Sequence, residues 1–137
     1  KEEAKIQCFK KINNGEVLAK LYEMIERQGG RVEEMKISER IISIRSPKSG
    51  YINGVNAHAL GELARQIGAG RYTKEDSIDH TVGIVLTRKK GDFVEVNDEL
   101  ARFYLSDKDV RLNDILNCFT IEDVCKSDEP LIYEVIE

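Results

Sequence analysis

One stretch decides the fold: residues 46–105 read SPKSGYINGVNAHALGELARQIGAGRYTKEDSIDHTVGIVLTRKKGDFVEVNDELARFYL. A short strand is predicted at residues 51–55, after the turn-forming Pro47 and Gly50, and a helix is predicted from Asn56, a residue type common at helix N-caps. A polar loop and further glycine-marked β segments follow the helix. This order of elements is typical of a compact α+β unit.

The apolar residues in and just before this stretch show both secondary-structure periods. From Leu60 onward they recur at i, i+3, i+4 and i+7, which predicts one buried helix face. Residues 40–45 are rich in β-branched side chains and predict a strand. Residues 82–86 form a nearly continuous apolar run, which predicts a strand buried on both faces, and residues 101–105 alternate as a last core strand does.

Two helices are predicted before this unit. Residues 1–12 and about 16–28 each carry one apolar stripe at helical spacing, and Gly15 and Gly29 suit the ends of the two helices. They form a hairpin whose apolar side nothing else in the sequence obviously covers. We therefore interpret the hairpin as the end of an upstream domain, joined by a polar crossing segment at residues 31–38.

Two more elements are expected after the unit. Residues 109–118 carry apolar side chains at helical spacing and predict a helix. Residues 130–136 are rich in apolar and β-branched side chains and predict a final strand.

Composition narrows the class of protein. The 137 residues are 41% hydrophobic and 34% charged, with a net charge of −4, which argues against nucleic acid as a partner because duplex binding needs a basic surface. No apolar run approaches the ~20 residues of a membrane span, and the N-terminus does not resemble a signal peptide, so we expect a cytoplasmic protein. Cys8, Cys118 and Cys125 lack Cys-x-x-Cys spacing and are expected to be reduced, structural thiols.

The run Gly68-Ala69-Gly70-Arg71 superficially resembles the start of a dinucleotide-binding loop. The third glycine of such a loop is replaced by Thr73, and the run follows a helix instead of joining a strand to one. The favoured interpretation is a helix end that feeds a loop whose Arg71 reaches outward. That loop is either structural or closes over a neighbouring site.

Other candidate sites are weaker. Asp76, Asp79 and His80 are close in sequence, but a metal needs three or four converging ligands, and the carboxylates suit turns and caps better. The serines lack the context of a nucleophile elbow, and no nucleophile is marked beside a base. The residues alone therefore predict no active site.

Several short motifs occur in the order found in one known family. They are Gly50-Tyr51-Ile52, Leu60-Gly61, Gly68-Ala69-Gly70-Arg71, residues 74–79, Val82-Gly83-Ile84 and Gly91-Asp92-Phe93-Val94. In these motifs the chain resembles the C-terminal domain of pyrimidine-nucleoside phosphorylases, including thymidine phosphorylase. Residues 14–15 and 23–30 look like the end of that family's central α/β domain, and residues 130–136 look like its last strand.

The resemblance implies a fold and a domain division. The fold is an α/β-hammerhead, a barrel-sandwich-like β unit with packed helices, preceded by a helical hairpin. Residues 1–30 are expected to be the C-terminal helices of the upstream α/β domain, and residues 31–137 the C-terminal domain. The chain would then correspond to about the last third of such an enzyme.

The resemblance also implies an activity for the whole enzyme, a homodimer in this family. That activity is reversible phosphorolysis of uridine, thymidine or deoxyuridine to free base and (deoxy)ribose 1-phosphate, with phosphate as co-substrate and no other cofactor. The phosphate- and base-binding motifs belong to upstream domains, so this chain alone is expected to be inactive and monomeric. Gly68, Gly70, Arg71 and Tyr72 are similar in position to a family loop near the interdomain cleft and are the candidate cleft-closing loop.

Two other interpretations stay open. The chain could be a non-enzymatic biotinyl- or lipoyl-like carrier or partner-docking module, since residues 34–37 resemble a biotin-acceptor motif. Lys36, however, precedes the whole β unit, whereas an acceptor lysine lies on a hairpin between strands. The chain could also be a scaffold that only holds an interdomain cleft.

Overall fold

The computed structural model describes residues 1–126. The chain divides into two units, which we call the helical unit, residues 1–36, and the two-sheet unit, which begins at Ile37. Each unit is described by itself. Among the described residues, no helix has the length and apolar character that crossing a membrane requires.

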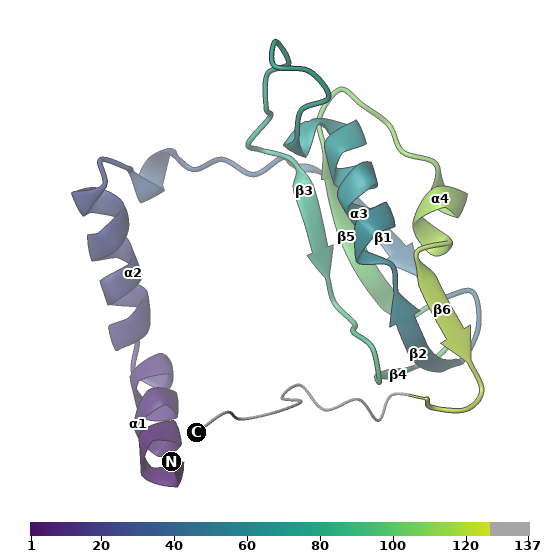
Figure 1. The fold of residues 1–137 in the computed structure, drawn as a ribbon, viewed down its shortest axis with the longest axis horizontal. Helices are drawn as coiled ribbons and strands as arrows, with labels where there is room; N and C mark the ends of the chain where they lie inside the picture. Colours follow the sequence, from purple (N-terminus) through teal and green to yellow (C-terminus); the bar gives the residue numbers. More distant parts are fainter. Residues whose placement is uncertain (127–137) are drawn as a thin grey trace. The chain divides into compact units, whose positions relative to one another are not determined.

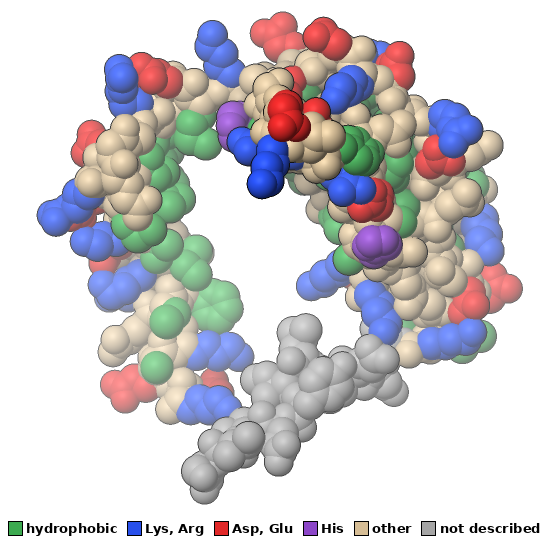
Figure 2. Space-filling model, turned by 45° about the horizontal axis from the view of Figure 1, so that its top comes forward, with side chains coloured by type: hydrophobic (Ala, Val, Ile, Leu, Met, Phe, Trp, Pro, Cys, Tyr) green, Lys and Arg blue, Asp and Glu red, His purple; other side chains and the backbone are tan. Residues whose placement is uncertain are grey.

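The helical unit contains α1 (Glu2–Asn13), α2 (Glu16–Arg27) and the 3-10 turn η1 (Val32–Glu34). Both predicted helices are confirmed. Gly15, with φ +84°, and Gly29, with φ +81°, adopt the left-handed backbone that lets the chain turn at the helix ends. None of the residues of α1 and α2 is buried, and their hydrophobic side chains gather along one side of the helices (Figure 2).

The two-sheet unit is a mixed α+β structure built on two antiparallel sheets (Figure 1). Its elements are β1 (Arg40–Arg45), β2 (Gly50–Val55), α3 (Ala57–Ala64), η2 (Arg65–Ala69), β3 (Gly83–Leu86), β4 (Phe93–Val94), β5 (Glu99–Leu105), α4 (Leu112–Leu116) and β6 (Phe119–Glu122). One sheet has the strand order β1-β5-β3 and the other β4-β2-β6. Strands that are neighbours in a sheet are therefore mostly distant in sequence.

The helix α3 begins where the sequence predicts. The side chain of Asn56 accepts a hydrogen bond from the backbone N–H of Ala59 at 3.0 Å, which satisfies one of the free donors at the helix start. Leu60 and Leu63 are buried, so the predicted apolar face does point into the core.

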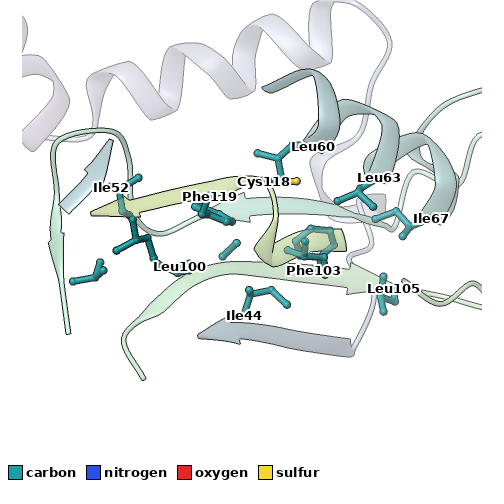
Figure 3. Packing of buried hydrophobic residues seen from close by; sticks show 14 residues of the cluster. Ile44, Ile52, Leu60, Leu63, Ile67, Leu100, Phe103, Leu105, Cys118 and Phe119 are labelled. Atoms are coloured by element: carbon teal, nitrogen blue, oxygen red, sulfur yellow. The ribbon is translucent and has the colours of Figure 1, made fainter. Parts of the chain in front are cut away.

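The hydrophobic core lies between the two sheets and includes side chains from α3 and α4 (Figure 3). In β5, the central strand of its sheet, Ala101, Phe103 and Leu105 are completely buried, while Arg102 and Tyr104 alternate with them. The predicted alternation is confirmed. The buried hydrophobic residues are Ile44, Ile52, Leu60, Leu63, Ile67, Val94, Leu100, Ala101, Phe103, Leu105, Ile115, Cys118, Phe119 and Ile121.

One strand prediction is wrong. Residues 82–86 do contain β3, but Val85 is 47% exposed and Leu86 44% exposed, so the strand is not buried on both faces. Val85 and Leu86 point to opposite faces, so this end of β3, an edge strand that pairs with β5 alone within residues 1–126, is uncovered on both faces. An apolar run indicates that a segment is at least partly buried, but it does not show whether one face or both faces of the strand will be covered.

Two further differences concern the C-terminal part, and one prediction there is not tested. The predicted helix at residues 109–118 is shorter, since α4 covers Leu112–Leu116. The strand β6, Phe119–Glu122, follows it and pairs with β2, although the sequence analysis did not predict it. The predicted strand at residues 130–136 lies outside the described residues.

Candidate functional site

The candidate cleft-closing loop leaves the C-terminal end of α3. The helix continues into η2, a π-helical turn that is interrupted at Gly68, where φ is +110°. Only glycine adopts this backbone without strain, so the glycine at position 68 allows the helix to end here. The Gly68 carbonyl then accepts the backbone N–H of Asp79 at 2.9 Å, which closes the mouth of the loop.

Asp79 fastens the returning end of the loop. Its carboxylate accepts the backbone N–H of Thr81 at 2.9 Å and the Thr81 hydroxyl at 2.6 Å. A hydrogen bond from the Ser106 hydroxyl, followed by those from Thr81, lowers the pKa of Asp79 to about 2. Because Ser106 follows β5 directly, Asp79 joins the loop to the end of the central strand.

Asp76 fastens the outgoing end. Its carboxylate accepts the backbone N–H groups of Thr73 at 3.0 Å and Tyr72 at 2.8 Å, together with the Thr73 hydroxyl at 3.0 Å. The hydrogen bonds from Thr73 and Tyr72 lower the pKa of Asp76. Both carboxylates therefore act as turn residues, which confirms their predicted role.

Arg71 and Tyr72 lie in the outgoing part of the loop, directly after Gly70. Arg71 is exposed, and its guanidinium makes no ion pair within residues 1–126. Tyr72 lies beneath the guanidinium of Arg65, whose Cζ is 4.2 Å from the centre of the ring. Arg65 in turn pairs with Glu62, one helical turn earlier. The loop therefore presents Arg71 as an exposed cation, and Lys74 is a second exposed cation for which residues 1–126 supply no ion pair.

An open hollow of about 490 Å³ lies beside this loop, within the two-sheet unit. Side chains from α3, from α4 and the turn after it, and from the loop line it: His58, Ala59, Glu62, Leu63, Gln66, Tyr72, Asp114 and Asn117. Polar and apolar side chains share this lining, and the hollow is open to solvent, so it is not the enclosed kind of cavity that buries most of a small ligand.

The structure does not assemble the other candidates into a site. Within the described residues, no group of three or more His, Cys, Asp or Glu side chains is placed to hold a metal ion. Lys36 is exposed in an irregular segment between η1 and β1, so a strand does not flank it on each side as in a biotin-acceptor hairpin.

The three cysteines are free thiols in different surroundings. Cys118 is buried in the core, and burial raises the pKa of its thiol, as expected for a structural cysteine. Cys8 and Cys125 are exposed. The prediction of a structural role is therefore wrong for these two residues, because neither one packs into the core.

Two residues of this arrangement, Arg65 and Ser106, were not predicted from the sequence. Arg65 was hidden because its contact with Tyr72 depends on the turn of the chain at Gly68. Ser106 was hidden because its partner, Asp79, is distant in sequence. The signal that did find the loop was its pattern of glycines and aspartates, which marks turns.

Comparisons with known proteins show which proteins this chain is similar to. Residues 51–122 match the family model for the pyrimidine nucleoside phosphorylase C-terminal domain. Pyrimidine-nucleoside phosphorylases of Staphylococcus aureus strains USA300 and NCTC 8325 / PS 47 are each 37% identical to this chain over 115 residues, and that of the bovine strain RF122 / ET3-1 is 36% identical. The matches cover 80% of this chain and 27% of each relative. The chain thus spans little more than a quarter of the length of these relatives.

Proposed function

The chain belongs to the pyrimidine nucleoside phosphorylase C-terminal domain family, and from that premise we propose that it works as the C-terminal part of a nucleoside-cleaving transferase. The reaction is reversible phosphorolysis of uridine, thymidine or deoxyuridine. A phosphate oxygen bonds to the sugar C1′, the C1′–N bond to the pyrimidine breaks, and the base leaves with that electron pair and takes up a proton. The match over residues 51–122 is the observation that carries this proposal.

The same family supports a finer description of the fold. Two three-stranded antiparallel sheets around one core, with α3 and α4 packed at it, agree with an α/β-hammerhead. We infer that residues 31–137 form this domain and that residues 1–30 complete an upstream α/β domain. The whole enzyme is then a cytoplasmic homodimer, and the isolated chain is a monomer.

The isolated chain is inactive under this proposal. The carboxylates Asp76 and Asp79 are both occupied by hydrogen bonds within the loop, which leaves them acting as turn residues and not as acids or bases. Phosphorolysis needs cationic groups that hold phosphate beside the sugar, and the family resemblance assigns these groups to upstream domains.

The contribution of this chain to turnover is the loop of Gly68, Gly70, Arg71 and Tyr72. Domain closure in enzymes depends on loops that reach a cleft and exclude water from it. The exposed Arg71, held on a fastened loop, has the charge to contact an oxyanion of the substrates as the cleft closes. Gly68 and Gly70 allow the chain to turn sharply where it leaves the helix, and this turn is needed to place Arg71.

The activity test compares this chain with the full-length enzyme that contains it. Each is given phosphate with thymidine or uridine, and free base is measured. We expect base from the full-length enzyme and none from the chain. Free base from the chain alone would contradict the proposal, and so would a full-length enzyme that releases none.

Substituting Arg71 tests the role of the loop. In the full-length enzyme, Arg71→Ala should lower kcat by about tenfold to a hundredfold, the effect of losing one charge-assisted hydrogen bond in the transition state. Stability should change by less than about 0.5 kcal/mol, because Arg71 is exposed. The matched control is Arg111→Ala, which removes an exposed arginine that pairs with Asp114 on α4. Equal kinetics for the two variants would remove the loop from the mechanism.

A further inference from the structure

Arg65 contacts Tyr72, the residue that follows Arg71, and its stem lies near Gly70, the residue before it. A Cβ atom built on Gly70 would lie 3.4 Å from Cγ and 3.5 Å from Cβ of Arg65, so the space that a side chain at position 70 would occupy borders the stem of Arg65. On the other side of Arg71, the ring of Tyr72 packs on the Arg65 guanidinium. Arg65 therefore supports the residue that follows Arg71.

Arg65 is itself held in place. Its Nη2 pairs with Glu62 on α3, which orients the guanidinium from the helix side. Its Nε is buried without a hydrogen-bond partner among the described residues, an unfavourable arrangement. The guanidinium thus supports Tyr72 although its Nε has no hydrogen-bond partner among the described residues. Arg65 also begins the π-helical turn η2, a kind of turn that is frequent at functional sites.

Asp76 also holds Tyr72, through the backbone of that residue. Its carboxylate accepts the backbone N–H of Tyr72, so Tyr72 is bound through its ring by Arg65 and through its backbone by Asp76. Arg71, directly before the residue held in this way, keeps its own side chain exposed. A guanidinium fixed at its base loses little further freedom when it meets an oxyanion, which is the benefit of preorganisation.

We propose that Arg65 is a positioning residue for Arg71: it holds Tyr72, the residue that follows Arg71, so that the Arg71 guanidinium is ready to meet an oxyanion of the substrate pair when the cleft closes. This inference rests on the proposed function, which supplies the substrates. Arg65 touches no substrate under this proposal, and its effect on turnover passes entirely through Arg71.

The first experiment tests the hold without using activity. Trypsin cleaves after arginine, so the rate of cleavage of the Arg71–Tyr72 bond in this chain, followed by mass spectrometry, reports how often the loop opens. Arg65→Ala should accelerate this cleavage at least about threefold, the population change expected when a partly exposed cation–π contact is lost. Arg111→Ala should leave the rate unchanged. Equal cleavage rates in the wild type and Arg65→Ala overturn the inference.

The second experiment tests the connection to turnover. In the full-length enzyme, Arg65→Ala should lower kcat for phosphorolysis severalfold or more, and adding Arg71→Ala to it should give the same kcat as Arg71→Ala alone. Such non-additivity is expected when one residue acts only through the other. A purely structural role for Arg65 would instead lower thermal stability and multiply with the Arg71→Ala loss.

The outcomes separate the inference from the proposed function. If the full-length enzyme is active and the two losses multiply, Arg65 acts independently of Arg71 and the inference is wrong, while the proposed function stands. If the full-length enzyme releases no base, the proposed function is wrong, and the inference about turnover falls with it. Faster trypsin cleavage together with non-additive kcat losses supports both.

Discussion

The two units of this chain carry similar apolar patterns with different results. Fourteen hydrophobic residues of the two-sheet unit form one buried cluster (Figure 3), whereas α1, α2 and η1, all within the described residues, contain no buried residue. Phe9 and Phe103 illustrate the contrast, since the first is 56% exposed and the second is completely buried. An amphipathic period therefore predicts a helix or strand, but it does not tell whether its apolar face is covered.

The contrast has an energetic meaning. Full burial of a large apolar side chain contributes about 1.5–3 kcal/mol, and the two-sheet unit repeats this gain across its core. Helices of the length of α1 and α2, 12 residues each, are marginal in water without tertiary packing. We expect the stability of the isolated chain to reside in the two-sheet unit.

The largest expected effect comes from making the same substitution in each unit. Phe103→Ala should lower the free energy of unfolding by about 3–5 kcal/mol, because it removes a buried ring and leaves a cavity. Phe9→Ala, its matched control, should change the same quantity by less than about 0.5 kcal/mol. Urea unfolding of the 137-residue chain measures both. A large loss for Phe9→Ala would show that the helical unit belongs to the same cooperative structure.

A smaller effect is expected at the helix starts. Asn56→Ala should cost about 1 kcal/mol, because the hydrogen bond from the side chain to the N–H of Ala59 is lost, and Asn56→Asp should retain most of the stability. In the helical unit, Lys1 precedes α1 without a side-chain cap. Lys1→Ser should therefore leave the urea midpoint of the two-sheet unit unchanged. Equal midpoints for Asn56→Ala and the wild type would show that α3 does not depend on its cap.

The smallest effect is one of pH. The folded-state pKa of Asp79, about 2, lies below the ordinary value of about 3.9, so Asp79 stabilises the folded state above the unfolded pKa. This contribution is lost as the pH falls through about 4 towards about 2. Asp79→Asn should therefore flatten the acid dependence of the urea midpoint in that range. A slope equal to that of the wild type would contradict the expected role of the Asp79 carboxylate.

Glu16 is the matching carboxylate of the helical unit. Its pKa is also lowered, first by a hydrogen bond from Lys11, but both side chains lie on the exposed helices. Glu16→Gln should leave the acid dependence of the two-sheet unit unchanged. A difference between Glu16→Gln and the wild type would mean that the two units share their unfolding transition.

The candidate site was predictable in part. The positions of Gly68, Asp76 and Asp79 marked a turn, because these residue types adopt or stabilise turn backbones wherever they occur. The contact of Arg65 with Tyr72 was not predictable. These residues are seven positions apart, and a helix that continued would have carried Tyr72 away along its axis. They meet only because the chain turns at Gly68.

By itself, the sequence determined the local elements: where α1, α2, α3, β1 and β5 form, and which faces of α3 and β5 are apolar. Tertiary structure alone decided that β3 lies at a sheet edge, that β6 pairs with β2, and that Arg65 supports Tyr72, the residue that follows Arg71. The reason is the range of the forces involved. Helix caps, turns and hydrophobic periods act over a few residues, whereas the cover over a strand and the partner of a side chain depend on segments that are distant in the chain.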